Sequence, residues 1–355
     1  MKKLFIIIAI FTIAQNNIHA QGCVAIKSNG GYCTMEGHGK EKWTLNVNNR
    51  YYKSYKHYVG TVEQKQRVDL GTEVINHAYS GDFTLTRKLK QGWSVAFDMP
   101  ILANTRSSLY EHGGKSRHDT HSFGMGDVRI AAYKWLTDPV RMKKANLQFG
   151  IGLKLPTGDY KFTDKFYVND STNILGPVDQ SIQLGDGGLG FTTEFNAFYN
   201  FAKGFTVYGN FYYLINPREQ NGTSTTRGSA PSAATVRNGS DVMSVPDQYM
   251  LRAGVNYMTA AWTFSAGLRK ECLTVHDLIG GSNGFRRPGY IVSVEPGITY
   301  EFKKFSLYTY LPVALKRNRT QSVPDKIKTE ITGVYSQGDA AFADYTLNIG
   351  ATFKF

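Results

Sequence analysis

Residues 345–355 read Y-T-L-N-I-G-A-T-F-K-F, and the pattern of this stretch decides the fold of the chain. An apolar side chain stands at every second position, and polar or small residues stand between them. A β-strand points alternate side chains to opposite faces, so the stretch predicts a strand with one apolar and one polar face. Eleven residues of a tilted strand are enough to cross a bilayer core. The stretch therefore predicts a strand that crosses a membrane.

The same alternation recurs in eleven earlier segments. They lie near residues 43–52, 79–88, 93–101, 126–135, 146–156, 188–201, 205–216, 249–258, 262–273, 290–302 and 305–316. Pro100 lacks the backbone N–H that a central strand needs, so a bulge or a strand end is expected there. Twelve such strands predict an all-β fold, a transmembrane antiparallel up-and-down β-barrel over residues 42–355. The barrel must close, because lipid cannot satisfy an open strand edge.

The connections between these strands alternate in length. The turns after the second, sixth, eighth and tenth strands are short, residues 137–145 form a somewhat longer one, and the six others are long. The long loops include a basic, His-bearing loop at 104–122 and a Ser-, Thr- and Gly-rich loop at 217–246, which we expect to be mobile. Short periplasmic turns and long outer loops are typical of outer-membrane barrels. Both chain termini are then periplasmic.

The tryptophans test this topology independently. Trp43, Trp93 and Trp262 begin strands that run outward, and Trp135 ends a strand that runs back. All four are predicted to lie at one level with Phe355, where an aromatic girdle belongs at the periplasmic interface. Other aromatic residues expected at this level are Phe201, Phe205, Tyr257, Tyr300, Phe302 and Phe305.

The N-terminal region reads as an export signal. Lys2 and Lys3 precede an apolar run at 4–13, so residues 1–20 are predicted to be a signal peptide that is cleaved before Gln21. Residues 21–41 are predicted to form a periplasmic segment with a disulfide between Cys23 and Cys33, because an exported chain permits one. Lipidation of Cys23 is the competing interpretation. Cys272 is then a lone thiol that is expected to pack rather than react.

The formal net charge of +13 is large. An exported barrel does not routinely meet nucleic acid, so that class of partner is not predicted. The charge favours contact with outer-membrane lipid and anionic lipopolysaccharide, or an interior that favours anions. The simplest interpretation is that basic loops lie on an anionic surface.

Nine charged residues fall on the polar, inward faces of the predicted strands. A charge that faced lipid at mid-membrane would cost about 2–4 kcal/mol, which supports their inward placement. Neighbouring strands are expected to pair Asp98 with Arg129, Lys154 with Glu194, and Arg269 with Glu295. Either the charges brace the lumen, or they form a constriction that selects solutes by charge. The nine candidates are Arg50, Asp98, Asp127, Arg129, Lys154, Glu194, Arg252, Arg269 and Glu295.

Other motifs carry weaker signals. His112, His118 and His121 share a loop, but no helix or rigid pair supports the spacing of a metal site. His276 and Ser282 are six residues apart with a loop between them, which does not favour a lipase pair. The glycines of residues 187–190 are expected where a strand enters the membrane, since no helix follows to help bind a phosphate. We therefore predict no metal, cofactor or enzymatic activity.

Three short stretches carry a family resemblance. Residues 124–128 (G-M-G-D-V), 152–159 (G-L-K-L-P-T-G-D) and 184–190 (L-G-D-G-G-L-G) resemble the outer-membrane transporter family named for the meta-cleavage pathway of phenol degradation. Asp186 departs from that pattern, since a serine is expected there. The terminal amphipathic strand with Phe355 also resembles the C-terminal signal of bacterial outer-membrane barrels, which implies the barrel-assembly machinery as a partner. The family resemblance implies a barrel that passes hydrophobic or aromatic compounds.

These observations predict a protein of the bacterial outer membrane. Its expected function is that of a channel or transporter that passes small solutes by passive diffusion, with hydrophobic or aromatic compounds and anions as the candidate classes. The alternative is a non-conducting barrel with a structural or surface-binding role.

Overall fold

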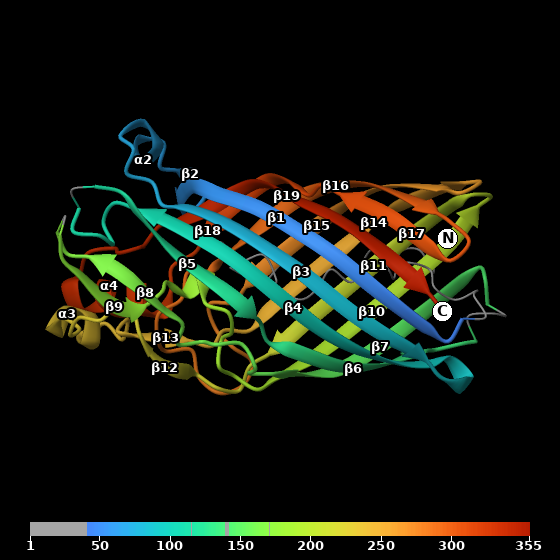
Figure 1. The fold of residues 1–355 in the computed structure, drawn as a ribbon, viewed down its shortest axis with the longest axis horizontal. Coiled ribbons are helices and arrows are strands. Elements are labelled where there is room, and N and C mark those ends of the chain that lie inside the picture. The colour runs from blue at the N-terminus through green and yellow to red at the C-terminus, as the bar shows by residue number, and fades with distance from the viewer. Residues whose placement is uncertain (1–40, 115, 139–141, 170) are drawn as a thin grey trace.

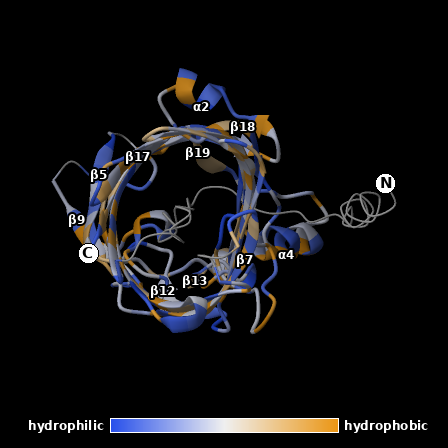
Figure 2. Ribbon diagram, turned by 90° about the vertical axis from the view of Figure 1, so that its right-hand side faces the viewer, coloured by the Kyte–Doolittle hydropathy of each residue, from blue (hydrophilic) through white to orange (hydrophobic). Residues whose placement is uncertain are grey.

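The computed structural model describes residues 41–114, 116–138, 142–169 and 171–355. These residues form a closed antiparallel barrel of twelve strands in which each strand pairs with the next in sequence and the last pairs with the first. Viewed along its axis, the barrel is a single ring of strands (Figure 2). Closure is the physical solution that leaves no edge unpaired. The predicted fold is therefore confirmed.

Several barrel strands are longer than the sequence pattern indicates, others have about the predicted length, and two are interrupted. In order around the wall they are β1 (Trp43–Val59), β3 (Ile75–Lys88), β4 (Trp93–Ser108), β5 (His118–Met125) continued by β6 (Val128–Trp135), β7 (Ala145–Leu155), β10 (Gly190–Ala202), β11 (Phe205–Ile215), β14 (Gln248–Thr259), β15 (Trp262–Leu273), β16 (Gly289–Glu301), β17 (Phe305–Tyr310) continued by β18 (Val313–Arg319), and β19 (Ala340–Lys354).

The closing strand β19 has the two faces that its sequence predicts. Ile349 and Phe353 are exposed on the outer face, whereas Asn348 and Thr352 are buried on the inner face. Its end pairs with the start of β1, where Trp43 N donates to Phe355 O at 2.8 Å and Phe355 N donates to Trp43 O at 3.0 Å. These hydrogen bonds close the ring.

Proline 100 does not interrupt its own strand, contrary to the prediction. Its carbonyl accepts a hydrogen bond from Gly126 N at 2.8 Å. The N–H and C=O of a strand residue face the same neighbour, so the N–H that Pro100 lacks would have faced the break between β5 and β6. The neighbouring strand therefore carries the irregularity, because no ladder hydrogen bond is available there. A similar break at Leu311 and Pro312 separates β17 from β18.

The long connections carry structure of their own. The short elements of these connections gather at one end of the barrel, while the chain's C-terminus lies at the other (Figure 1). They are β2 (Val62–Glu63), α2 (Gln66–Asp69), β8 (Thr163–Tyr167), β9 (Asn173–Pro177), η2 (Gln180–Ile182), β12 (Gln220–Ser224), α3 (Ala233–Arg237), β13 (Val242–Ser244) and α4 (Val323–Thr332), with η1 (Lys90–Gly92) in a short turn at the opposite end. Among the described residues, no helix has the length and apolarity to span a membrane.

Two loop predictions are wrong. The 104–122 segment is strand at both ends, since β4 continues to Ser108 and β5 begins at His118, and only the residues between them form a loop. The 217–246 loop contains two strands and a helix, and its Met243 and Val245 are buried. In both segments the outward side chains no longer need to be apolar, so the alternation that marks a membrane strand disappears while the backbone structure continues.

The four tryptophans lie at strand ends on the short-turn side of the barrel. Trp262 packs edge-on against Tyr300 at 4.5 Å, and Trp135 packs against Phe198 at 5.9 Å. Trp93 is 45% exposed, as suits a residue at a lipid interface. The membrane girdle itself stays a prediction.

The N-terminal predictions fall outside the described residues. These are the signal peptide, the segment at 21–41 up to residue 40, and the disulfide between Cys23 and Cys33 or the lipid on Cys23. Cys272 is a buried free thiol on β15, as expected for a packing residue.

Candidate functional site

Eight of the nine predicted interior charges are buried on barrel strands, and the ninth, Asp127, lies half-buried at the break between β5 and β6. Each alternates along its strand with residues that face outward. Arg269, for example, is buried, whereas Leu268 beside it is 55% exposed. Strand alternation therefore places these charges inside the barrel, where all of them except Arg50 fall into three separate groups.

The first wall group consists of Asp98, Arg129 and Glu194, on β4, β6 and β10. Arg129 lies 3.6 Å from Asp98 and also forms an ion pair with Glu194. Tyr133 donates to the same glutamate at 3.0 Å, and the Arg129 guanidinium stacks over the Tyr212 ring at 5.8 Å. The predicted pairing of Asp98 with Arg129 is confirmed.

The predicted pairing of Lys154 with Glu194 is wrong. The register of β7 and β10 places Gly190 opposite Lys154 and Gly150 opposite Glu194, so the two charges lie four residues apart along the ladder. Register cannot be read from alternation alone, because a shift of two residues preserves the faces but changes every partner.

The second wall group consists of Arg252, Arg269, Glu271 and Glu295, on β14, β15 and β16. Arg252 donates to Glu295 at 2.9 Å, and Arg269 donates to Glu295 at 3.2 Å and to Glu271 at 2.7 Å. The predicted pair of Arg269 and Glu295 is confirmed. Glu271 was not predicted, although its position two residues after Arg269 places it on the same inner face.

Arg50 and Asp82 are further charges on the inner wall, outside the wall groups. Arg50 on β1 is 3% exposed. Asp82 on β3 accepts a hydrogen bond from Asn48 at 3.3 Å. Asp82 was not predicted either, although the alternation of its strand marks it as inward.

The third group, termed the junction group, consists of Asp127, Lys154 and Asp186. Lys154 lies 3.6 Å from Asp127 and forms an ion pair with Asp186. Asp127 also accepts hydrogen bonds from Gly158 N at 3.0 Å and from Asp186 N at 3.1 Å. One residue of this group comes from each of the three Gly-rich motifs, so the motifs meet at one point of the interior.

Close packing explains the glycines of these motifs. A side chain at Gly158 would approach Leu184 O to 2.7 Å, and one at Gly185 would approach Asp127 to 2.6 Å. The motifs therefore build the junction where the loop 156–189 turns into the barrel. Asp186, the departure from the family pattern, supplies the ion-pair partner of Lys154.

A cavity of about 80 Å³ lies beside the junction group. A water molecule needs roughly 10–15 Å³ of such space, so several waters or a small molecule fit. The junction charges and several amides form its polar wall. Its apolar wall includes Pro100, Leu102, Leu184, Leu214, Met243, Pro246 and Leu273.

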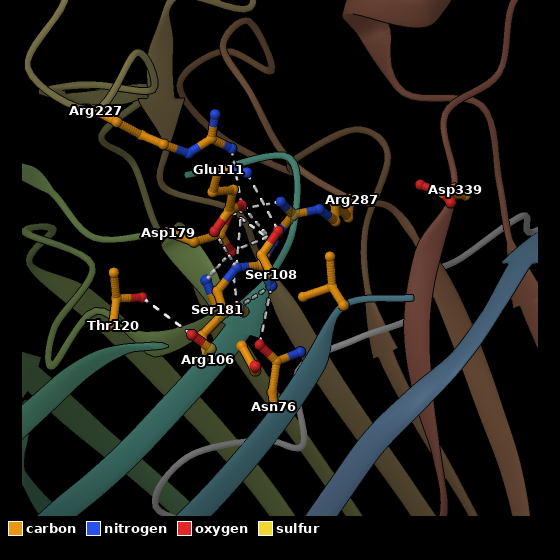
Figure 3. A network of polar contacts seen from close by, with 12 residues as sticks. Asn76, Arg106, Ser108, Glu111, Thr120, Asp179, Ser181, Arg227, Arg287 and Asp339 are labelled. Atoms are coloured by element: carbon orange, nitrogen blue, oxygen red, sulfur yellow. Dashed lines mark hydrogen bonds and ion pairs between the residues drawn. The ribbon is translucent and has the colours of Figure 1, made fainter. Parts of the chain in front are cut away.

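Five charged residues join the loops above this cavity, and we term them the mouth cluster (Figure 3). Arg287 binds Asp179 through two hydrogen bonds of 2.8 and 2.6 Å, and Arg106 lies 3.5 Å from the same carboxylate. Arg106 also donates to Glu111 at 2.8 Å, and Arg227 donates to Glu111 at 2.8 Å. One residue comes from β4 and four come from four different loops.

Electrostatics keep both carboxylates of the mouth cluster ionised. Burial raises the pKa of Asp179, but the guanidinium groups of Arg106 and Arg287 outweigh it and hold that pKa well below its ordinary value. Burial also raises the pKa of Glu111. The guanidinium group of Arg106 outweighs this effect and keeps that pKa below its ordinary value. The cluster is therefore a set of charge-assisted hydrogen bonds at neutral pH.

The mouth cluster fixes the roof of the cavity. Asp179 directly precedes η2, and Gln180, Gln183 and Leu184 in and after η2 line the cavity. The carbonyl of Ile182 in η2 also accepts hydrogen bonds from Asn104 and Ser122 on the wall. We term residues 179–184 the lid.

The histidine loop is held by aromatic packing. His118 stacks on Tyr167 at 4.1 Å, His112 stacks on Phe166 at 5.5 Å, and His112 Nδ1 accepts a hydrogen bond from Tyr167 N. Across the described ranges, no group of three or more His, Cys, Asp or Glu residues is arranged to hold a metal ion. His276 contacts Lys326 at 3.0 Å.

Comparison with known proteins adds likenesses of fold. No protein-family model matches the chain, and no curated protein matches it in sequence. An outer-membrane channel from Pseudomonas putida F1 superposes with a TM-score of 0.59 at 12% identity, over 91% of this chain and 99% of that one. The translocator domain of an autotransporter from Neisseria meningitidis gives 0.46 at 13% identity, over 90% of each chain. A toluene transporter from Ralstonia pickettii gives 0.44 at 11% identity, over 96% and 99%.

At such identities the likeness concerns the fold alone. A closed twelve-stranded barrel with an apolar outer face and a polar inner face, similar in fold to an outer-membrane channel, is a protein of the bacterial outer membrane.

Proposed function

We propose that this protein is a channel that passes small solutes across the outer membrane by passive diffusion through the barrel interior. The observation that carries the proposal is the cavity between the junction group and the lid, inside a wall whose inward face is polar. A spanning barrel with a polar inner face and a ligand-sized space is the general design of outer-membrane channels.

The charges of the interior favour solutes without net charge. The two wall groups and the junction group contain four cationic side chains and six carboxylates, and every cation lies within 3.6 Å of a carboxylate. Pairing cancels most of this charge and the remaining excess is of carboxylates, so the net charge of +13 of the whole chain does not make the interior anion-selective. The apolar wall of the cavity favours solutes that have an apolar part. Among the predicted classes, hydrophobic or aromatic solutes fit better than anions.

Liposome swelling with pure protein tests the proposal. The solutes would be glucose, phenyl glucoside and glucuronate, which do not cross the lipid bilayer readily. We expect entry of phenyl glucoside to be faster than entry of glucose despite its larger size, and glucuronate to be slowest. Fastest entry of glucuronate would reverse the assigned solute class. No swelling with any solute would favour the non-conducting alternative.

A matched pair of variants locates the path. Leu273→Trp places a large ring in the cavity, whereas Leu268→Trp places the same ring on the outer face of the same strand. The first should slow entry of every solute, and the second should leave the rates unchanged. Equal rates for Leu273→Trp and the unaltered protein would exclude the cavity from the path.

The mouth cluster favours one second candidate, a barrel that is permanently plugged and acts as a structural or surface-binding protein. The lid covers the cavity, and the wall groups bridge neighbouring strands. A plugged barrel would stay non-conducting after the lid is released, whereas a gated channel would not.

A further inference from the structure

A row of tyrosines and lysines crosses the outer face of four neighbouring strands near the long-loop end. The Lys270 ammonium lies over the rings of Tyr249 and Tyr290 at 5.6 and 5.0 Å, and the Lys316 ammonium lies over Tyr290 at 5.8 Å. The four residues come from β14, β15, β16 and β18. We term them the outer tyrosine–lysine row.

This row faces away from the barrel interior. Lys270 stands two residues after Leu268, which is 55% exposed, and one residue after Arg269, which is buried in the interior. Tyr249 stands two residues before Leu251, which is 44% exposed. Strand alternation therefore puts the row on the face that contacts the membrane.

The height of the row matches the outer membrane interface. Lys270 lies eight residues along β15 from Trp262. At about 3.3 Å per residue and a strand tilt of roughly 40°, this separation spans about 20 Å across the membrane. The apolar band of such barrels is about 25 Å tall, so Lys270 lies close to its upper border and its ammonium extends toward the head groups.

The two lysines lack carboxylate partners within the described residues, where no ion pair includes either ammonium. The cations of the two wall groups and of the junction group all have carboxylate partners. So does Lys56 near the long-loop end, which lies 3.0 Å from Asp344. Two cations without anionic partners, at a lipid interface and flanked by aromatic rings, are complementary to an anionic head group.

We propose that the outer tyrosine–lysine row binds a phosphate group of a phosphorylated glycolipid in the outer leaflet, the lipid A part of lipopolysaccharide. The ammonium groups of Lys270 and Lys316 contact the phosphate, and the Tyr249 and Tyr290 rings pack against the sugar and the upper acyl chains. The row thus gives the predicted contact with lipopolysaccharide one defined face of the barrel, independent of any solute path.

Lipid binding by the full-length protein in detergent tests the site. Native mass spectrometry would compare bisphosphorylated lipid A with the same lipid after removal of its phosphates. The unaltered protein should retain the bisphosphorylated lipid preferentially. The double variant Lys270→Gln/Lys316→Gln should bind it at least about tenfold more weakly and should show no preference.

Lys56→Gln is the matched control, because its ammonium already has a carboxylate partner, and it should bind like the unaltered protein. Unchanged circular dichroism and heat-dependent gel mobility would show that the double variant is folded. Equal retention of both lipids by the unaltered protein, or full retention of the phosphorylated lipid by the folded double variant, would overturn the proposal.

Discussion

The barrel wall and the barrel mouth hold their charges in different ways. In the wall, Arg129 and Arg269 stand on strands, and the register of the sheet fixes their partners. At the mouth, the carboxylates Glu111 and Asp179 are loop residues, and ion pairs alone tie them to Arg227 and Arg287. Removal of a wall charge leaves a rigid wall with an unbalanced field, whereas removal of a mouth charge releases loops. We therefore expect the wall charges to determine which solutes pass, and the mouth cluster to determine whether solutes reach the barrel interior.

Both regions depend on the closed ring of strands. The largest effect should therefore follow from weakening the contact between β1 and β19, which closes the ring. Deletion of Phe355 removes the two hydrogen bonds between this residue and Trp43. We expect poor membrane assembly, measured as loss of the heat-modifiable folded band in outer-membrane fractions. Normal insertion of the deletion variant would contradict the role given to this pair.

The next largest effect should come from Asp179→Ala. This change leaves the buried guanidinium group of Arg106 and the partly buried one of Arg287 without their shared carboxylate. Removal of one partner of a buried pair typically costs about 3–5 kcal/mol. Hydrogen exchange of residues 179–184 should become much faster. Asp159→Asn changes an exposed carboxylate of the same loop and is the control. Equal protection in both variants would mean that the mouth cluster does not hold the lid.

A wall charge should alter selectivity with little change in conductance. Arg129→Gln leaves Asp98 and Glu194 without their cation, so the reversal potential under a salt gradient should shift toward cations. Arg87→Gln, an exposed residue near Trp43, should leave it unchanged. An unshifted reversal potential for Arg129→Gln would place this group outside the path.

Acid should have the smallest effect. The lowered pKa values of Glu111 and Asp179 mean that lid closure is fully stabilised above their ordinary values, about 4, and is lost as pH falls through the lowered values. Conductance should therefore stay constant from about pH 8 to 5 and rise only in more acidic solution. Asp179→Ala should show no such rise. A change near pH 6 would indicate control by a histidine instead.

The wall was largely predictable, because the same alternation that marks membrane strands also marks inward charges. The alternation identified Arg129 and Arg269 correctly as inward charges. It also marks Asp82 and Glu271 as inward, although these two were not predicted. Alternation did not fix every partner: the pairs of Asp98 with Arg129 and of Arg269 with Glu295 are confirmed, whereas the pairing of Lys154 with Glu194 is wrong, since register depends on long-range contacts.

The mouth was not predictable. Glu111 and Arg227 are 116 residues apart, and neither stands in a periodic pattern. Above the lipid-facing band, outward side chains are free to be polar, so the signal that locates strands is lost. The lid and the mouth cluster therefore emerge only from the folded chain.

Single-channel conductance in planar bilayers tests the central claim most directly, with the unaltered protein and Asp179→Ala compared side by side. A gated channel predicts small or infrequent openings for the unaltered protein and larger, longer openings for Asp179→Ala. A folded Asp179→Ala variant that never conducts would contradict the claim and would identify the barrel as permanently closed.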